Sequence, residues 1–294
     1  MDYNIAVKTS FGERLSKAQT LKKVGRFYDL GSPYYLRVWG EHIHDGYYTT
    51  GKESKRQAQV KLVQLLASEA RIARGDKVLD VGCGMGGSSI WLARRLGATT
   101  VGITISSKQA MIAVERAAQQ DAESSFILMD AERMAFRPER PIFDAIWAVA
   151  VMTHLHDQQG FLNAASKLLK KGGRFIIFDW MLGPDIDDGG TDPIIEQVST
   201  GMLLSSLHGM RAYLGWFSSL GAEVTYESDI TGHTIRTWDV AFSTLTDPKV
   251  WKLALKATHE ERSLLLPFMK GLSPMKQAML QGKLISGAIV AQQH

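Results

Sequence analysis

A short apolar run that passes into a glycine-dense turn is the feature that most constrains the fold. Residues 78–87 read VLDVGCGMGG, with a strand expected over 77–81 and a helix beginning at Ser88. Glycines in such a turn let the backbone approach a ligand that any Cβ would exclude. The sequence therefore predicts a Rossmann-like unit, with a ligand bound where the strand meets the turn.

One carboxylate discriminates between two kinds of cofactor. Gly82, Gly84 and Gly87 fit the dinucleotide pattern GxGxxG, which also expects an acid about 20 residues later for the ribose hydroxyls. That region, residues 101–104, reads VGIT and carries no acid. Asp80 at the strand end suits an ammonium group, which S-adenosylmethionine has and a nicotinamide dinucleotide lacks. We predict the methyl donor, with a dinucleotide or a ligand-free turn as the alternatives.

Composition narrows the class of protein. The chain has 294 residues, of which 45% are apolar and 22% charged, as in an ordinary globular protein. Its net charge of +4 is too small to predict a nucleic-acid partner. No apolar run approaches the roughly 18 residues of a membrane span, and residues 1–20 show no signal peptide. The single cysteine, Cys83, forms no internal disulfide, so we expect a cytoplasmic protein. No metal site is expected.

Beyond the first strand, strands and helices alternate along the chain. Buried strands are expected over residues 99–103, 126–129, 143–151 and 174–179. Helices are expected over residues 88–96, after the capping serines 106–107, and after Asp157, the last ending at glycines 172–173. This alternation predicts an α/β fold with a doubly wound, mostly parallel seven-stranded sheet.

Two segments interrupt the alternation and predict a helical cap. Residues 181–218 and 231–283 hold loops and helices, around a core strand near 222–228. Ligands of open α/β sheets bind at the carboxyl edge, so we expect the cap to cover that edge. The predicted organisation is one structural domain with an N-terminal aromatic lid (1–60), a donor-binding core (61–180), cap insertions (181–283) and a last core strand (284–294).

Large side chains of the cap are candidates for the wall of a substrate cavity. They are Met202, Leu203, Tyr213, Trp216, Trp238, Phe242 and Met269. For each of them, packing inside the cap is the alternative. A large apolar cap favours a hydrophobic acceptor, with an aromatic molecule preferred.

Anchors for the methyl donor follow the ends of successive strands. Asp80 and the backbone of Gly82 and Gly84 suit its amino-acid end. Thr104 stands after the second strand and can bond the ribose with help from Gln109. Asp130, with the backbone of Ala131, suits adenine, unless Asp130 is an ordinary turn residue. Aromatic side chains of the lid suit the sulfonium cation.

Several motifs together resemble the gamma-tocopherol methyltransferase family, which is related to sterol methyltransferases and cyclopropane fatty acid synthases. They are FYD (27–29), WGEHIHDGYY (39–48), VLDVGCGMGGSS (78–89) and GITIS (102–106) with Gln109. The resemblance covers about residues 26–180. It implies donor contacts at Tyr28, His44, Gly82, Gly84, Thr104, Gln109, Asp130, Ala131 and Val149.

The chain departs from these relatives after its fourth strand. Where relatives often carry acids before a Glu-His pair, residues 147–154 read WAVAVMTH, with Ala150 and Thr153 in place of the acids. Sterol and cyclopropane chemistry needs a base close to a carbocation. The loss of these carboxylates favours methyl transfer to an oxygen, a nitrogen or an electron-rich aromatic carbon.

Histidines are the candidates for a general base. His154 follows the fourth strand at the edge that faces the donor, so we rank it first, ahead of His44 and His233. A structural role is the alternative for each. The predicted function is methylation of a hydrophobic small molecule. Alternatives are a cyclase or rearrangement enzyme that keeps the donor as a bound cation, and a donor-binding module. An RNA or protein methyltransferase is disfavoured, and a homo-oligomer is left open.

Overall fold

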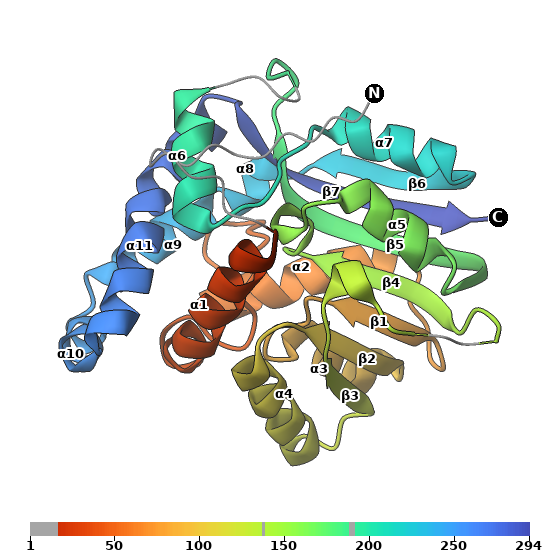
Figure 1. Ribbon diagram of the computed structural model, residues 1–294, viewed down its shortest axis with the longest axis horizontal. Coiled ribbons are helices and arrows are strands. Elements are labelled where there is room, and N and C mark those ends of the chain that lie inside the picture. Colours follow the sequence, from red (N-terminus) through yellow and green to blue (C-terminus); the bar gives the residue numbers. More distant parts are fainter. Residues whose placement is uncertain (1–16, 137–138, 188–191) are drawn as a thin grey trace.

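A seven-stranded sheet forms the centre of the molecule in the computed structural model, which describes residues 17–136, 139–187 and 192–294 (Figure 1). Its strands are β1 (Lys77–Val81), β2 (Thr99–Thr104), β3 (Ser124–Leu128), β4 (Phe143–Val149), β5 (Leu169–Leu182), β6 (Ala222–Asp229) and β7 (Leu284–Gln293). They lie in the order β3-β2-β1-β4-β5-β7-β6. Only β7 runs antiparallel to its neighbours, which confirms the predicted mostly parallel, doubly wound α/β fold.

Helices cover both faces of this sheet and build the cap. They are α1 (Lys17–Val38), α2 (Lys55–Glu69), α3 (Gly87–Leu96), α4 (Ser107–Gln119), α5 (Gln158–Ser166), α6 (Pro193–Met202), α7 (Met210–Ser219), α8 (Thr231–Thr234), α9 (Arg236–Leu245), α10 (Pro248–Lys256) and α11 (His259–Leu280). Two short 3-10 helices, η1 (Ala131–Arg133) and η2 (Met152–His154), follow β3 and β4. None of the helices in the described ranges is both long and apolar enough to cross a bilayer.

Burial explains why the central strands form where the sequence predicts them. In β4 the side chains on both faces are buried, and Trp147 is completely enclosed. Strands covered on both faces read as continuous apolar runs rather than alternating ones. Caps then fix the helix starts: Ser106 accepts a hydrogen bond from the Gln109 N–H, and Asp157 from the Gly160 N–H. Both capping predictions are confirmed.

One local prediction was wrong, and one helix was not predicted. Helix α5 ends at Ser166 rather than at glycines 172–173, because Leu169 already pairs with Phe143 at the start of β5. Gly172, with φ +75°, therefore lies within the first part of β5. In the lid region, helix α1 was not predicted, because its internal Pro33 and its aromatic pairs obscure the helical pattern.

The cap stands beside the carboxyl ends of the parallel strands, where α1, α6, α9 and α11 gather in Figure 1. A separate apolar cluster holds it together, made by Leu182, Ile195, Val198, Met202, Leu204, Trp238, Ala241, Leu272, Met275, Ala278, Met279 and Leu284. The four-part division of the chain remains a prediction.

Candidate functional site

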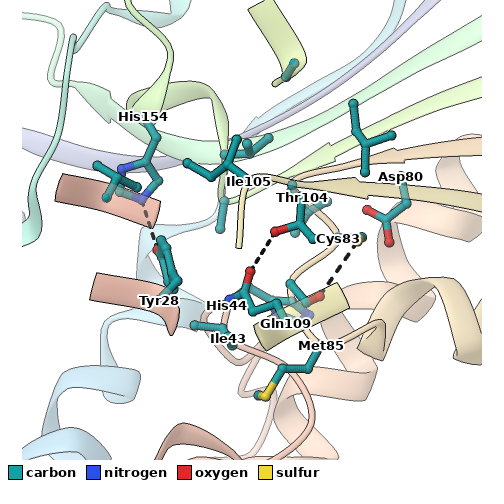
Figure 2. A pocket seen from close by; sticks show the side chains of 18 of the residues that line it. Tyr28, Ile43, His44, Asp80, Cys83, Met85, Thr104, Ile105, Gln109 and His154 are labelled. Carbon is teal, nitrogen blue, oxygen red and sulfur yellow. Dashed lines mark hydrogen bonds between the residues drawn. The ribbon is translucent and has the colours of Figure 1, made fainter. Parts of the chain in front are cut away.

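Two adjoining cavities lie at the carboxyl edge of the sheet. The first, about 120 Å³ and here called the strand-edge cavity, is formed mainly by the ends of β1, β2 and β4 and the segment after β3. Its walls include all ten residues that the sequence proposed for the donor: Tyr28, His44, Asp80, Gly82, Gly84, Thr104, Gln109, Asp130, Ala131 and Val149. Figure 2 shows several of these side chains around one space. Their individual roles as donor contacts remain a prediction.

Asp80 is the only carboxylate of β1 and is almost completely buried. Its Oδ2 accepts a hydrogen bond from the Ser89 hydroxyl at 2.5 Å. Burial outweighs this bond and raises the pKa of Asp80 to about 7, from an ordinary value of 3.8. A cation beside it would reverse that cost, so the carboxyl suits the ammonium group of an amino acid.

The glycines of the turn are required for different reasons. A Cβ on Gly82 would lie 2.4 Å from Val151 Cγ2, and one on Gly87 would lie 2.5 Å from the Glu41 carbonyl oxygen. At these two positions the protein itself fills the space that a Cβ would need, and the expected approach of a ligand to the backbone stays a prediction. Gly84 differs. Its Cβ would meet only ordinary contacts at 3.7 Å or more, so Gly84 leaves its backbone open to the cavity.

Thr104 and Gln109 act as one unit. The Thr104 hydroxyl donates to Gln109 Oε1 at 2.8 Å, and both side chains are buried (Figure 2). The carboxamide carbonyl is thus occupied, which leaves the Gln109 amide N–H groups for a ligand hydroxyl. One carboxylate oxygen of Asp130 is also already hydrogen-bonded within the protein. Its Oδ1 accepts a hydrogen bond from the Glu132 N–H at 2.9 Å and so caps η1. Asp130 is therefore a turn residue, as the alternative interpretation expected, and it also lies on the cavity wall.

The second cavity, about 240 Å³, lies under the cap and is here called the cap cavity. It is lined mainly by aromatic and aliphatic side chains of α1, α9 and α11. Of the predicted cap residues, Met202, Trp238 and Met269 line it. Leu203, Tyr213, Trp216 and Phe242 are absent from its wall, and Tyr213 and Trp216 pack against the sheet core instead. Tyr28, Ile43, His44 and His154 line both cavities and form their common boundary.

His154 is held on this boundary by both of its ring nitrogens. Nδ1 lies 3.1 Å from the Leu203 carbonyl oxygen, which can only accept, so Nδ1 carries the proton. Nε2 is then an acceptor, and the Tyr28 hydroxyl donates to it at 3.1 Å (Figure 2). Burial lowers the pKa of His154 and raises that of Tyr28. At neutral pH the pair is a neutral imidazole that accepts from an un-ionised phenol.

His44 is less suited to proton transfer. Its Nδ1 donates to the Asp45 carbonyl oxygen at 2.8 Å, and its Nε2 lies 3.1 Å from His42 Nδ1. Both nitrogens are therefore engaged within the loop, and burial lowers the pKa of His44 to about 4. His233 is not brought to either cavity. Its Nδ1 lies 3.0 Å from the Tyr48 carbonyl oxygen, and its ring packs against Tyr47.

The sequence analysis did not identify two buried carboxyl groups near the cavities as candidate site residues. Asp179 follows the middle of β5 and accepts from the Thr153 N–H, the Thr153 hydroxyl and the Trp180 N–H. Asp45 lines the cap cavity, and its Oδ2 accepts from the Trp180 indole at 3.0 Å. Burial raises the pKa of Asp45 to about 7 and that of Asp179 to about 6. Asp45 was readable in the sequence as an acid inside the histidine-rich motif, but nothing there placed it on a cavity wall. In the described ranges no cluster of three metal-ligating side chains occurs.

Sequence comparisons relate the chain to known methyltransferases. Residues 79–177 match the model of a methyltransferase domain. The chain is 27% identical to 27-O-demethylrifamycin SV methyltransferase of Amycolatopsis mediterranei, over 76% of this chain and 81% of that protein. It is 30% identical to cycloartenol-C-24-methyltransferase of Arabidopsis thaliana, over 77% of this chain and 68% of that protein. Tocopherol O-methyltransferase of the same plant is 31% identical over 60% of this chain and 53% of that protein.

Solved structures share the fold. A mycolic acid cyclopropane synthase complexed with SAH and CTAB has a TM-score of 0.80 at 19% identity, covering 93% of this chain and 98% of that one. The [4+2]-cyclase SpnF has a TM-score of 0.74 at 22% identity, covering 92% of this chain and 94% of that one. At these identities the likeness concerns the fold alone.

Proposed function

Because the chain belongs to the class I S-adenosylmethionine-dependent methyltransferases, we propose that it methylates a hydrophobic small molecule held in the cap cavity. Membership in the family is carried by the methyltransferase domain match and by the cycloartenol methyltransferase relative. The observation that carries the acceptor proposal is the shared boundary of the two cavities at Tyr28, His44 and His154. A donor in one cavity and an acceptor in the other would meet there.

The residues of the strand-edge cavity fit the donor. Asp80 offers a buried carboxylate for the ammonium group, Gly84 leaves its backbone open to the cavity, and Gln109 offers amide N–H groups for a ribose hydroxyl. S-adenosylmethionine supplies a methyl group on a sulfonium. The contribution of the protein is to align acceptor and donor, which is worth on the order of 7–11 kcal/mol in favourable cases.

His154 is the base that this geometry favours. An acceptor hydroxyl that approaches the boundary would take the place of the Tyr28 hydroxyl on Nε2 and give its proton to that nitrogen. The Leu203 carbonyl keeps Nδ1 protonated, so the imidazolium that forms remains hydrogen-bonded. Tyr28 stays a phenol, since burial raises its pKa, and its hydroxyl holds Nε2 in place only until the acceptor binds. We therefore favour transfer to an oxygen, in which the base contributes about 10²–10⁴-fold.

The experiment is a search for the acceptor with labelled donor. S-adenosylmethionine carrying a labelled methyl group is mixed with the protein and a metabolite extract, and products are followed by mass spectrometry. We expect label in an apolar small molecule, and with that molecule His154→Ala should lower kcat while the affinity for S-adenosylhomocysteine stays within about twofold. A normal rate in His154→Ala would exclude the base role.

A cyclase that keeps its donor bound is the second candidate. The fold shared with a [4+2]-cyclase and the apolar cap cavity favour it. The same assay separates the two functions by mass. A methyltransferase adds one methyl group and releases S-adenosylhomocysteine, whereas a cyclase changes the structure of its substrate at constant mass and leaves the donor intact.

A further inference from the structure

Asp45 is the one carboxyl group among the described residues that line the cap cavity, and it is 4% exposed. Most of its neighbours on the wall are aromatic or aliphatic, and the hydroxyls of Thr237 and Thr244 and two histidines are also present. Asp45 lies in the loop between α1 and α2. Its hydrogen bonding is poorer than that of the neighbouring Asp179. Asp179 accepts from three donors of Thr153 and Trp180, whereas the described residues provide Asp45 with one side-chain donor, the Trp180 indole N–H.

Within the part of the chain that the structure describes, no lysine or arginine is paired with this carboxyl group. Among the described residues that line the cap cavity, none is a lysine or an arginine, and both histidines on its wall are held neutral by burial. A buried carboxylate without a counter-ion is unfavourable unless a ligand supplies a cation or a hydrogen-bond donor. The second oxygen of Asp45 is the available acceptor.

The side chains around Asp45 favour a cation over a neutral donor. The Trp180 ring, which bonds Asp45 through its indole, lies 5.7 Å from the Trp238 ring, measured between centroids. Tyr34 and Tyr35 also line the cavity, whereas the Trp39 ring on its wall already carries the Lys55 ammonium, 4.6 Å from the ring centroid. Aromatic faces attract an ammonium group and do not favour an anion. A carboxylate beside indole rings is thus a matched environment for a protonated amine on an apolar body.

We propose that the cap cavity selects an acceptor that carries a protonated amine, and that Asp45 is the ionic partner of that amine. The inference rests on the proposed function only in taking the cap cavity as the acceptor site. The amine serves as a binding handle, separate from the atom that receives the methyl group, because the base lies at His154. Asp45 is accordingly a specificity-determining residue rather than a catalytic one.

The test compares three probes of one chain length by calorimetry at pH 8, with the protein saturated with S-adenosylhomocysteine. The probes are n-octylamine, which is protonated at this pH, 1-octanol and octanoate. We expect octylamine to bind at least tenfold more tightly than octanol, as a charge-assisted hydrogen bond implies, and octanoate to bind most weakly. Equal binding of amine and alcohol, or binding of none of the probes, would overturn the proposal.

The matched variants are Asp45→Asn and Asp239→Asn. Asparagine keeps an oxygen that can accept from the Trp180 indole, so the loop is expected to fold. Asp45→Asn should lose at least tenfold in octylamine affinity and keep its octanol affinity within about twofold. Asp239 lies on the exposed side of α9 beside Lys276, outside the cavity, and its variant should bind octylamine as the wild type does. Undiminished amine binding by Asp45→Asn would refute the inference.

The outcomes also separate this inference from the proposed function. Methylation of a neutral metabolite, with no preference for octylamine, would leave the methyltransferase function standing and remove the amine handle. Tight binding of octylamine through Asp45, with no methyl transfer to any metabolite, would support the amine site and contradict the proposed methyl transfer.

Discussion

Replacing Asp80 by asparagine should change donor binding and stability in opposite directions. Asp80 is buried against Ser89 on β1, and burial raises its pKa from 3.8 to about 7. Asparagine has the same shape and can still accept from the Ser89 hydroxyl, but it cannot carry the charge that an ammonium group needs. We therefore expect the affinity for S-adenosylhomocysteine to fall at least tenfold at pH 8.

The stability of the free protein should respond with the opposite sign. Between pH 3.8 and about 7 the folded protein keeps a proton on Asp80 that the unfolded chain has released. Unfolding therefore releases a proton in this window, and the free energy of unfolding falls as pH rises through it. At 1.36 kcal/mol per pKa unit, the loss at pH 8 is about 4 kcal/mol, which is the ceiling for the gain in Asp80→Asn.

Two measurements test these expectations for Asp80, one of stability and one of ligand affinity. Urea unfolding of the ligand-free protein at pH 8 should give a higher free energy for Asp80→Asn than for the wild type. In the wild type, the S-adenosylhomocysteine affinity should rise about tenfold from pH 6 to pH 8, as a carboxyl group with a pKa near 7 ionises. An Asp80→Asn variant that binds the ligand as tightly as the wild type, or a wild-type affinity independent of pH, would refute this reasoning.

Three further predictions concern the turn and the boundary. Gly84→Ala should weaken S-adenosylhomocysteine binding in calorimetry more than it lowers stability, since its Cβ meets no close contact but its φ of +53° costs about 1 kcal/mol; equal affinity would contradict this. Gly82→Ala should instead lower the midpoint of thermal unfolding strongly, because its Cβ would lie 2.4 Å from Val151, and an unchanged midpoint would count against the packing account. Tyr28→Phe removes the donor to His154 Nε2, so with the native acceptor kcat should fall by less than in His154→Ala, and a larger fall would reverse the two roles.

The sheet and most of the strand-edge cavity were predictable because short-range patterns determine them. Buried strands such as 77–81 and 143–149 are rich in apolar residues, and the residues that follow parallel strands meet at one edge of the sheet. For that reason Asp80, Thr104 and Asp130, far apart in the chain, line the same cavity.

The common boundary of the two cavities and the wall of the cap cavity were less predictable from the sequence. The bond between Tyr28 and His154 joins residues 126 positions apart and depends on how α1 packs over the sheet. The position of Asp45 on the cap cavity depends in the same way on Trp180 and α9. That the acids missing at positions 150 and 153 affect the choice of acceptor stays a prediction. The sequence analysis missed Asp45, which the loop between α1 and α2 places on the wall of the cap cavity.

The most direct test of this account is a crystal structure with S-adenosylhomocysteine bound. We expect the amino group of the ligand within hydrogen-bonding distance of Asp80 and its sulfur at the boundary formed by Tyr28, His44 and His154, facing the cap cavity. A ligand whose sulfur points away from that boundary, or whose amino group bonds a residue other than Asp80, would contradict it.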